Sequence, residues 1–302
     1  MDLSIRHFDF LDSFDYLWTE DADDYGKNKM NLFMLKINAN QFDYNLLQQN
    51  LLEPLLDFSV SRKAKEEYKN KHMSLSKQAR ERFVDHIRNT GELGELLLYC
   101  FLETHLNAPK ILSKLELKTS TAHYVNGSDG VHFLKLGNGN FQLIFGESKT
   151  VEDLTSALTQ AFQSIYNFKN EINDKGNNKS GIRYERSLIS NNLGKETFSE
   201  EEKSFIKNII YPKRENDFEV DDAFGILVGF EVEITDEDMK LPNALFRDKI
   251  KNIIDLEVRK RLPHIRKKIN EYELWGHNFY IYVLPFSELD KSRKSILKEI
   301  TT

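Results

Sequence analysis

The sequence predicts an α/β domain in which strands and helices pack around one core. Three stretches predict it: a β-hairpin over residues 128–149, a helix with one apolar stripe over 151–168, and a largely apolar strand over 223–234. Strands with period-two alternation beside helices with a 3.6-residue period are typical of this class. With 302 residues, the chain is long enough for one large domain or for a core domain with a smaller attached one.

The N-terminal part is predicted to be an α/β extension over residues 1–75, followed by the main domain over 76–302, or the whole chain forms one continuous domain. Acidic and aromatic residues alternate over 1–28, which indicates the packing of an edge strand. Residues 29–38 then have the pattern of a strand. Leucines at helical spacing over 41–57 predict an amphipathic helix.

A basic stretch over residues 61–82 overlaps a long helix pattern that starts near Ser76. The basic stretch is either the solvated face of a helix or a surface that follows a phosphate backbone. Glu92 and Glu95 interrupt the pattern beside two glycines, just before a run over 96–102 that is apolar on every side. Such a helix is buried, so its carboxylates are either functional, paired with lysines, or caps of a second helix. The glycines predict a close approach of this backbone to another element.

The hairpin turns at Gly137–Asn140, whose residues tolerate positive φ. Asp129 and Glu147 lie at equal distances from the centre of this turn, so antiparallel pairing brings both carboxylates to the open end of the hairpin. Glu147 and Lys149 share one face of the second strand, because side chains alternate with period two. His132 is out of phase with Asp129 and is expected on the opposite face.

Elements on both sides of the hairpin complete an order of helix, three strands and helix. A strand is expected over residues 111–119, and Thr150 is expected to cap the helix that follows the hairpin. The polar stretch over 169–203, rich in Asn, Gly, Lys and Ser, predicts a loop or a mobile excursion.

The C-terminal part continues the alternation. The apolar strand over 223–234 is expected at the centre of the sheet. A long helix pattern over 243–273 carries a second basic stripe, a further candidate surface for a phosphate backbone, and Pro263 is expected to kink or divide it. A last strand over 277–284 and a closing helix over 286–299 follow.

Composition excludes several classes of protein. A net charge of −6 argues against indiscriminate coating of DNA, although it suits a protein whose DNA is partly delivered by a partner. The one cysteine, Cys100, excludes an internal disulfide and a zinc finger. The acidic N-terminus is unlike a signal peptide, and no apolar run reaches the roughly 18 residues of a membrane span. A cytoplasmic protein without a membrane span is expected.

The two acids and the lysine at the open end of the hairpin suit metal-dependent cleavage of a phosphodiester bond. Mg²⁺ prefers carboxylate ligands, and it can neutralise a phosphate, activate a water molecule and stabilise a leaving oxygen. Asp129 and Glu147 are the candidate ligands, with the carbonyl oxygen of Ser148 as a third. Lys149 would orient or help deprotonate the attacking water and stabilise developing charge.

Two further contributions are expected from the helices. Either Glu95 or Glu92 would complete the metal site. Gln160 lies at the flank of the apolar stripe and is a candidate phosphate contact, ranked above Gln163, which falls opposite the stripe. The alternative is that the acid and the lysine form a plain ion pair at a strand end.

Three segments, Gly91-Glu92 to Glu95, Ser128-Asp129-Gly130 and Gly146-Glu147-Ser148-Lys149, resemble the motifs of the PD-(D/E)xK nuclease superfamily. Within it, GSDG followed by LIFGESK and a helix rich in Ala, Phe and Gln resembles the HamA family, the effector subunits of bacterial Hachiman antiphage systems. The resemblance covers most of the chain and is most specific over 80–170, with Ser128 in place of the motif's proline. It implies a restriction-endonuclease-like mixed sheet flanked by helices, with α/β additions at both ends.

The resemblance also implies a function. It implies a Mg²⁺-dependent deoxyribonuclease, in which Mn²⁺ can substitute, that acts on DNA with a superfamily 2 helicase subunit (HamB-like). It implies metal roles for Asp129 and Glu147, a catalytic role for Lys149 and a supporting role for one helix glutamate. The alternative is a non-catalytic adaptor of the nuclease fold that binds the helicase or DNA.

Overall fold

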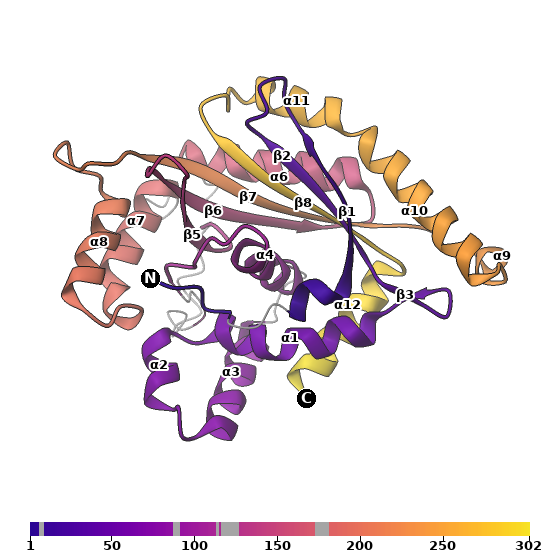
Figure 1. Ribbon diagram of the computed structural model, residues 1–302, viewed down its shortest axis with the longest axis horizontal. Coiled ribbons are helices and arrows are strands. Elements are labelled where there is room, and N and C mark those ends of the chain that lie inside the picture. The colour runs from indigo at the N-terminus through magenta and orange to yellow at the C-terminus, as the bar shows by residue number, and fades with distance from the viewer. Residues whose placement is uncertain (6–8, 87–90, 113–114, 116–126, 173–180) are drawn as a thin grey trace.

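The computed structural model describes residues 1–5, 9–86, 91–112, 115, 127–172 and 181–302, which include one six-stranded mixed sheet (Figure 1). From edge to edge its strands are β1 (Phe14–Asp21), β2 (Lys29–Leu35), β8 (Asn278–Phe286), β7 (Val220–Glu231), β6 (Phe141–Thr150) and β5 (Val131–Lys135). The four inner strands are parallel, and the two outer ones pair antiparallel to their neighbours. The predicted α/β class is therefore confirmed, with helices on both faces of the sheet.

The N-terminal residues contribute directly to this sheet. After the 3-10 turn η1 (Asp9–Ser13), β1 forms one edge, as its alternating aromatics predicted, and β2 pairs with β8 near the far end of the chain. The predicted strand over 29–38 is shorter, because β3 (Ile37–Asn38) leaves the sheet to pair with β4 (Gln41–Phe42).

Three helices follow β4. Helix α1 (Tyr44–Ser59) was predicted, and Asp43 caps it by accepting a hydrogen bond from the Leu46 amide at 3.0 Å. The basic stretch forms α2 (Arg62–Glu67) and α3 (His72–His86). The helix pattern that starts near residue 76 is divided, since α4 (Glu92–Thr104) begins separately.

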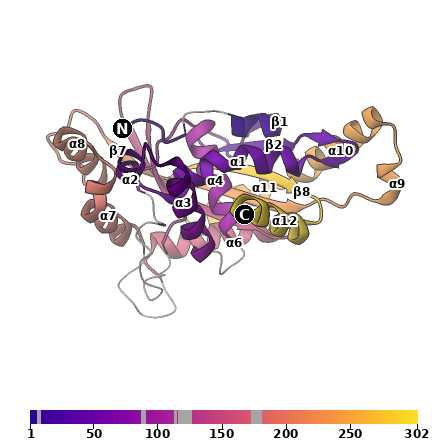
Figure 2. The same cartoon turned by 90° about the horizontal axis from the view of Figure 1, so that it is seen from below.

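Helices α4 and α6 (Leu154–Lys169) cover opposite faces of the sheet beside β6 (Figures 1 and 2). On one face, a Cβ at Gly146 would lie 3.0 Å from Leu98 of α4. On the other face, the ring of Phe145 lies 5.3 Å from that of Phe168 of α6. The apolar run over 96–102 is buried throughout, as its pattern predicted.

Near the hairpin, the predicted features include a strand over 111–119 and a helix cap at Thr150. The strand expected over 111–119 lies mostly outside the described residues. Lys110 forms an isolated β-bridge with His132, and residues 111–112 are not in a strand. The cap at Thr150 was wrong, because β6 continues through Thr150 along its parallel partner β7. Asp153 is the cap of α6, and it accepts a hydrogen bond from the Ser156 amide at 2.7 Å.

The loop predicted over 169–203 was also wrong where it is described. Residues 173–180 lie outside the described part, but α7 (Gly181–Asn192), η3 (Leu193–Lys195) and the start of α8 (Glu200–Ile210) occupy most of the rest. Few apolar residues mark these helices, and most of them are buried: Ile189, Leu193, Ile206, Ile209 and Ile210. A narrow apolar stripe in a polar stretch is a weak signal, so the polar composition dominated the prediction.

The C-terminal predictions were confirmed. Strand β7 lies inside the sheet, between β6 and β8. After α9 (Asp236–Met239), Pro263 separates α10 (Asn243–Arg259) from α11 (Leu262–Glu271) by starting the second helix. Helix α12 (Leu289–Thr301) closes the chain. Among the described residues, no helix combines the length and the apolar character needed to cross a membrane.

Candidate active site

The hairpin is built as its turn predicts. The Leu136 amide donates to the Asn140 carbonyl at 2.8 Å, and Gly139 has a φ of +89°. Val131 lies opposite Phe145 in the ladder. Beyond this pair the two strands lead to Asp129 and Glu147, so both acids lie at the open end of the hairpin, as predicted.

The first strand is irregular at that end. Gly146 accepts a hydrogen bond from the amide of Asp129 at 2.8 Å and donates one to the carbonyl of Gly130 at 2.8 Å. Two residues therefore lie opposite one, as in a β-bulge, and the alternation of side chains shifts. Asp129 and His132 consequently line the same cavity. The expectation that they lie on opposite faces was wrong.

Asp129 is held in place by β6. Its Oδ2 accepts hydrogen bonds from the amide and the hydroxyl of Ser148, at 2.6 and 2.7 Å. From the sequence, only the carbonyl oxygen of Ser148 was expected to take part in the site. The amide and hydroxyl contacts depend on the pairing across the hairpin, which the residue type of Ser148 does not indicate.

Glu147 and Lys149 lie on the face of β6 that α6 covers. The Lys149 Nζ lies 2.5 Å from Glu147 Oε1, and Ser164 of α6 also hydrogen bonds to the Glu147 side chain. The side chains of Glu147 and Lys149 are 12% and 29% exposed. The pair is therefore partly buried, unlike an ordinary surface ion pair. Ser164 was missed, because a serine on a helix gives no signal of its contact with a strand.

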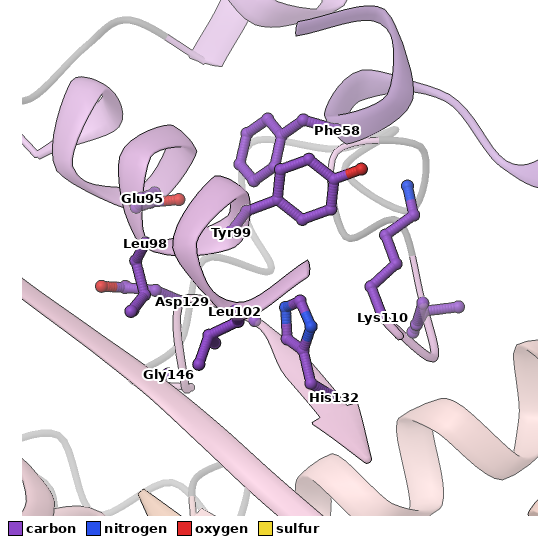
Figure 3. Close-up of a pocket in the computed structure, with 11 residues that line it drawn as sticks. Phe58, Glu95, Leu98, Tyr99, Leu102, Lys110, Asp129, His132 and Gly146 are labelled. Carbon is purple, nitrogen blue, oxygen red and sulfur yellow. The ribbon is translucent and has the colours of Figure 1, made fainter. Parts of the chain in front are cut away.

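The two helix glutamates occupy the first turn of α4. Glu95 lines the cavity with Asp129 (Figure 3), whereas Glu92, which is 1% exposed, is not part of that lining. A Cβ at Gly94 would lie 3.0 Å from the hydroxyl oxygens of both Ser148 and Thr150. The predicted close approach of this backbone is thus confirmed, and it sets α4 against β6.

The charges of this cluster act on one another. Burial raises the pKa of Asp129 well above its ordinary value, and Glu95 and Glu147 add to the rise. Burial also raises the pKa of Glu147, with a contribution from Glu95 that Lys149 opposes. Burial acts to lower the pKa of Lys149, but Glu147, Asp129 and Glu95 outweigh it, so the pKa of Lys149 is raised. Three carboxylates and one ammonium therefore form a single electrostatic unit.

The donor set suits a hard dication, although the side chains are engaged with one another. Within the described residues, no three His, Cys, Asp or Glu side chains are already arranged to hold a metal ion. Asp129 and Glu147 instead bind Ser148 and Lys149. All candidate donors are oxygens, and a dication would relieve the repulsion among Glu95, Asp129 and Glu147. These three residues fit an oxygen-ligated metal in chemistry.

A small cavity of about 20 Å³ extends from Glu95 and Asp129 toward the interior (Figure 3). Tyr99, Lys110 and His132 line its inner part. Burial lowers the pKa of His132 to about 4 and that of Lys110 to about 8. The His132 ring is thus neutral, and its Nδ1 donates to the Ala108 carbonyl at 2.8 Å. These residues meet only in the folded chain and were not foreseen.

The two glutamines of α6 differ in their surroundings. Gln163 accepts a hydrogen bond from the Tyr272 hydroxyl at 2.8 Å and donates one to Asn167 at 3.0 Å. Gln160 is exposed and lies about one helical turn before Ser164, on the same side of α6. The role of Gln160 as a phosphate contact stays a prediction.

The basic stretch over residues 61–82 contributes side chains to the interior. Arg62 is 8% exposed and lies 3.6 Å from the buried carboxylate of Glu196, and Lys65 pairs with Asp57 at 2.5 Å. Part of this basic stretch therefore stabilises the fold instead of facing solvent.

Comparison with known proteins places the chain in a family. No match was found among curated proteins. The family model of HamA matches residues 10–300, which include every strand of the sheet and nearly all of the closing helix. The chain belongs to the HamA family and is therefore a component of the Hachiman antiphage defence system.

Proposed function

We propose that this chain is the metal-dependent DNA nuclease of its defence system, with a restriction-endonuclease-like, PD-(D/E)xK core. One observation carries the proposal: Asp129, Glu147 and Glu95 converge with Lys149 at the open end of a hairpin, where Glu95 and Glu147 add to the raised pKa of Asp129 and Glu95 adds to that of Glu147. Structural ion pairs rarely gather three partly buried carboxylates around one lysine, because removing each charge from water is costly.

The acids are the proposed Mg²⁺ ligands, and Mn²⁺ can take the place of Mg²⁺. Asp129 and Glu147 would hold the ion, with the Ser148 carbonyl as a third donor. Glu95 is preferred to Glu92, since it lines the cavity beside Asp129. A bound dication would neutralise the attacked phosphate and activate water. Ser148 fixes the direction of the Asp129 carboxylate, which orients this ligand in advance.

Lys149 is proposed to act as a cation. Its pKa is raised, so it stays an ammonium at neutral pH and can donate hydrogen bonds to a water molecule or a phosphate oxygen. Of the two roles that the sequence left open, orientation with charge stabilisation is therefore favoured over abstraction of a proton.

DNA and a superfamily 2 helicase subunit (HamB-like) are the proposed partners. Gln160 is exposed on the side of α6 that carries Ser164, and it is the proposed phosphate contact. The net charge of −6 gives the free chain little attraction for DNA, which favours delivery of the substrate by the helicase.

Single substitutions test the nuclease. Glu147→Ala and Lys149→Ala are each expected to reduce Mg²⁺-dependent nicking of supercoiled plasmid by at least about 100-fold, because each removes a group that acts on the reacting phosphate. Nicking is measured with and without the helicase subunit and ATP. Glu152→Ala and Lys135→Ala are matched controls, since both side chains are exposed. Glu152 lies just after β6, and Lys135 lies on β5.

Cleavage at the wild-type rate in both active-site variants would disprove the proposed site. A different result would support the adaptor: the wild-type chain and its helicase complex bind DNA but never nick it with Mg²⁺ or Mn²⁺.

A further inference from the structure

The inner part of the cavity beside Asp129 contains a buried acceptor that lacks a donor. Nδ1 of His132 donates to the Ala108 carbonyl at 2.8 Å, so in the neutral ring the other nitrogen, Nε2, carries a lone pair. His132 is 1% exposed, and within the part of the chain that the structure describes no group donates a hydrogen bond to Nε2. Buried polar atoms in folded proteins almost always have a partner, so Nε2 needs a donor from another source.

The other two polar residues of the inner part do not supply this donor. Lys110 directs its Nζ toward α1, where it donates to the carbonyls of Asp57 and Val60, the second at 3.4 Å. The ring of Tyr99 lies 6.0 Å from that of His132, and Figure 3 shows its hydroxyl at the end of the ring that faces away from the imidazole. A donor for Nε2 must therefore come from the cavity itself.

The cavity lies directly beside Nε2. A Cβ added at Gly130, which also lines the cavity, would lie 3.4 Å from Nε2 of His132 and 3.7 Å from its Cδ2. This edge of the ring therefore faces the backbone segment that carries Asp129. The cavity volume of about 20 Å³ is enough for one water molecule, which needs roughly 10–15 Å³. A water molecule also brings the O–H donors that the site lacks.

The carboxylate of Asp129 is a second acceptor on the lining of this cavity. Both hydrogen bonds that the described residues make to it, from the amide and the hydroxyl of Ser148, end on Oδ2. Oδ1 is therefore left to accept from another donor. One O–H group of a water molecule can donate to Nε2 of His132 and the other to this carboxylate, and buried water molecules commonly have about two to four such partners.

We propose that the cavity binds one ordered water molecule that bridges Nε2 of His132 and the carboxylate of Asp129. Its consequence for catalysis rests on the proposed function, in which Asp129 is a metal ligand. His132 is then a positioning residue, because the water molecule and Ser148 hold the carboxylate from two sides. Partners of this kind orient a ligand before the metal binds, and their loss lowers metal affinity by roughly 10- to 100-fold.

A high-resolution crystal structure of the metal-free chain tests the water site directly. Electron density for one water molecule is expected about 3 Å from Nε2 of His132 and at hydrogen-bond distance from the Asp129 carboxylate. In Gly130→Ala this density is expected to disappear, because a methyl group would lie against Nε2. The added Cβ would be at an ordinary contact distance, and the φ of Gly130 is not positive, so the variant should fold. A dry cavity in the wild type, or a water molecule that contacts only one of the two groups, would overturn the site.

Two substitutions at His132 separate its two contacts. The amide of His132→Asn can replace Nδ1 as the donor to Ala108 but does not extend to the position of Nε2. His132→Gln places an amide group near the position of Nε2 and gives up the contact with Ala108. Mn²⁺ affinity, measured by calorimetric titration, is expected to fall by about 10-fold in His132→Asn and in Gly130→Ala, and to stay near the wild-type value in His132→Gln. Gly137→Ala is the matched control, since a Cβ there meets no atom within 4 Å.

The opposite order of the two His132 variants, equal losses in both, or wild-type affinity in His132→Asn and Gly130→Ala would disprove the positioning role. Thermal unfolding shows which variants are folded, and the wild-type crystal structure decides the water site without any variant. Failure of the proposed function gives a different result. A wild-type chain that binds no Mn²⁺ would overturn the metal site and with it the role of His132 in metal binding, whereas the bridging water molecule would still be seen in the metal-free crystal.

Discussion

The carboxyl group of Asp129 illustrates how single residues set the chemistry of this site. Removal from water raises its pKa, and Glu95 and Glu147 raise it further, against the effect of Lys149. A protonated carboxyl group cannot bind a dication until it loses its proton. As the pH falls, metal binding should therefore be lost at a higher pH than it would be at a site whose carboxyl groups have ordinary pKa values.

The pH dependence also discriminates between the two helix glutamates. Glu95→Gln removes a negative charge that raises the pKa of Asp129 and of Glu147, so both values should fall. The midpoint for loss of Mn²⁺ binding is then expected at a lower pH than in the wild type, measured by calorimetric titration across a series of pH values. Glu92→Gln is the control and should leave the midpoint unchanged. The opposite pattern would assign the role to Glu92.

The packing of α4 on β6 links an element to the site. Gly94 lets the helix approach Ser148, and Ser148 in turn holds Asp129. The sequence predicted this approach from the glycines. It did not reveal the contacted strand, because the two segments are more than 40 residues apart along the chain and their meeting depends on the tertiary fold.

Gly94→Val should therefore separate α4 from β6. A Cβ at this position would already lie 3.0 Å from two hydroxyl oxygens, so a larger side chain is expected to lower the free energy of unfolding by about 1–3 kcal/mol and to reduce nicking. Urea unfolding measures the first effect and a plasmid assay the second. Gly137→Val is the control, because a Cβ there meets no atom within 4 Å. Equal losses in the two variants would argue against a specific α4–β6 contact.

At the scale of the whole molecule, the first 75 residues are joined to the rest in two ways. They supply β1 and β2 to the common sheet. A buried polar network adds to this: Glu103 of α4 accepts hydrogen bonds from the amides of Ser4 and Ile5 at 2.6 and 3.3 Å, and Arg62 pairs with Glu196. Breaking such buried contacts is costly, which favours the single domain among the alternatives left open by the sequence.

Unfolding is accordingly expected to be one cooperative transition. In calorimetry, the measured enthalpy should equal the van't Hoff enthalpy. A fragment of residues 76–302 should fail to fold stably, because the edge of β8 that pairs with β2 would be left open. Two separate transitions, or a stable fragment, would instead support an N-terminal extension that folds on its own.

The sequence alone determined the features that depend on neighbouring residues. Turn residues at Gly137–Asn140 and period-two alternation were enough to place Asp129, Glu147 and Lys149 at one end of a hairpin. Contacts between distant segments were decided only by the tertiary structure: the pairing of β2 with β8, the approach of Glu95 to Asp129, and the hydrogen bond from Ser164 to Glu147. Each of these contacts depends on how sheet and helices pack, and no local pattern of residue types encodes that packing.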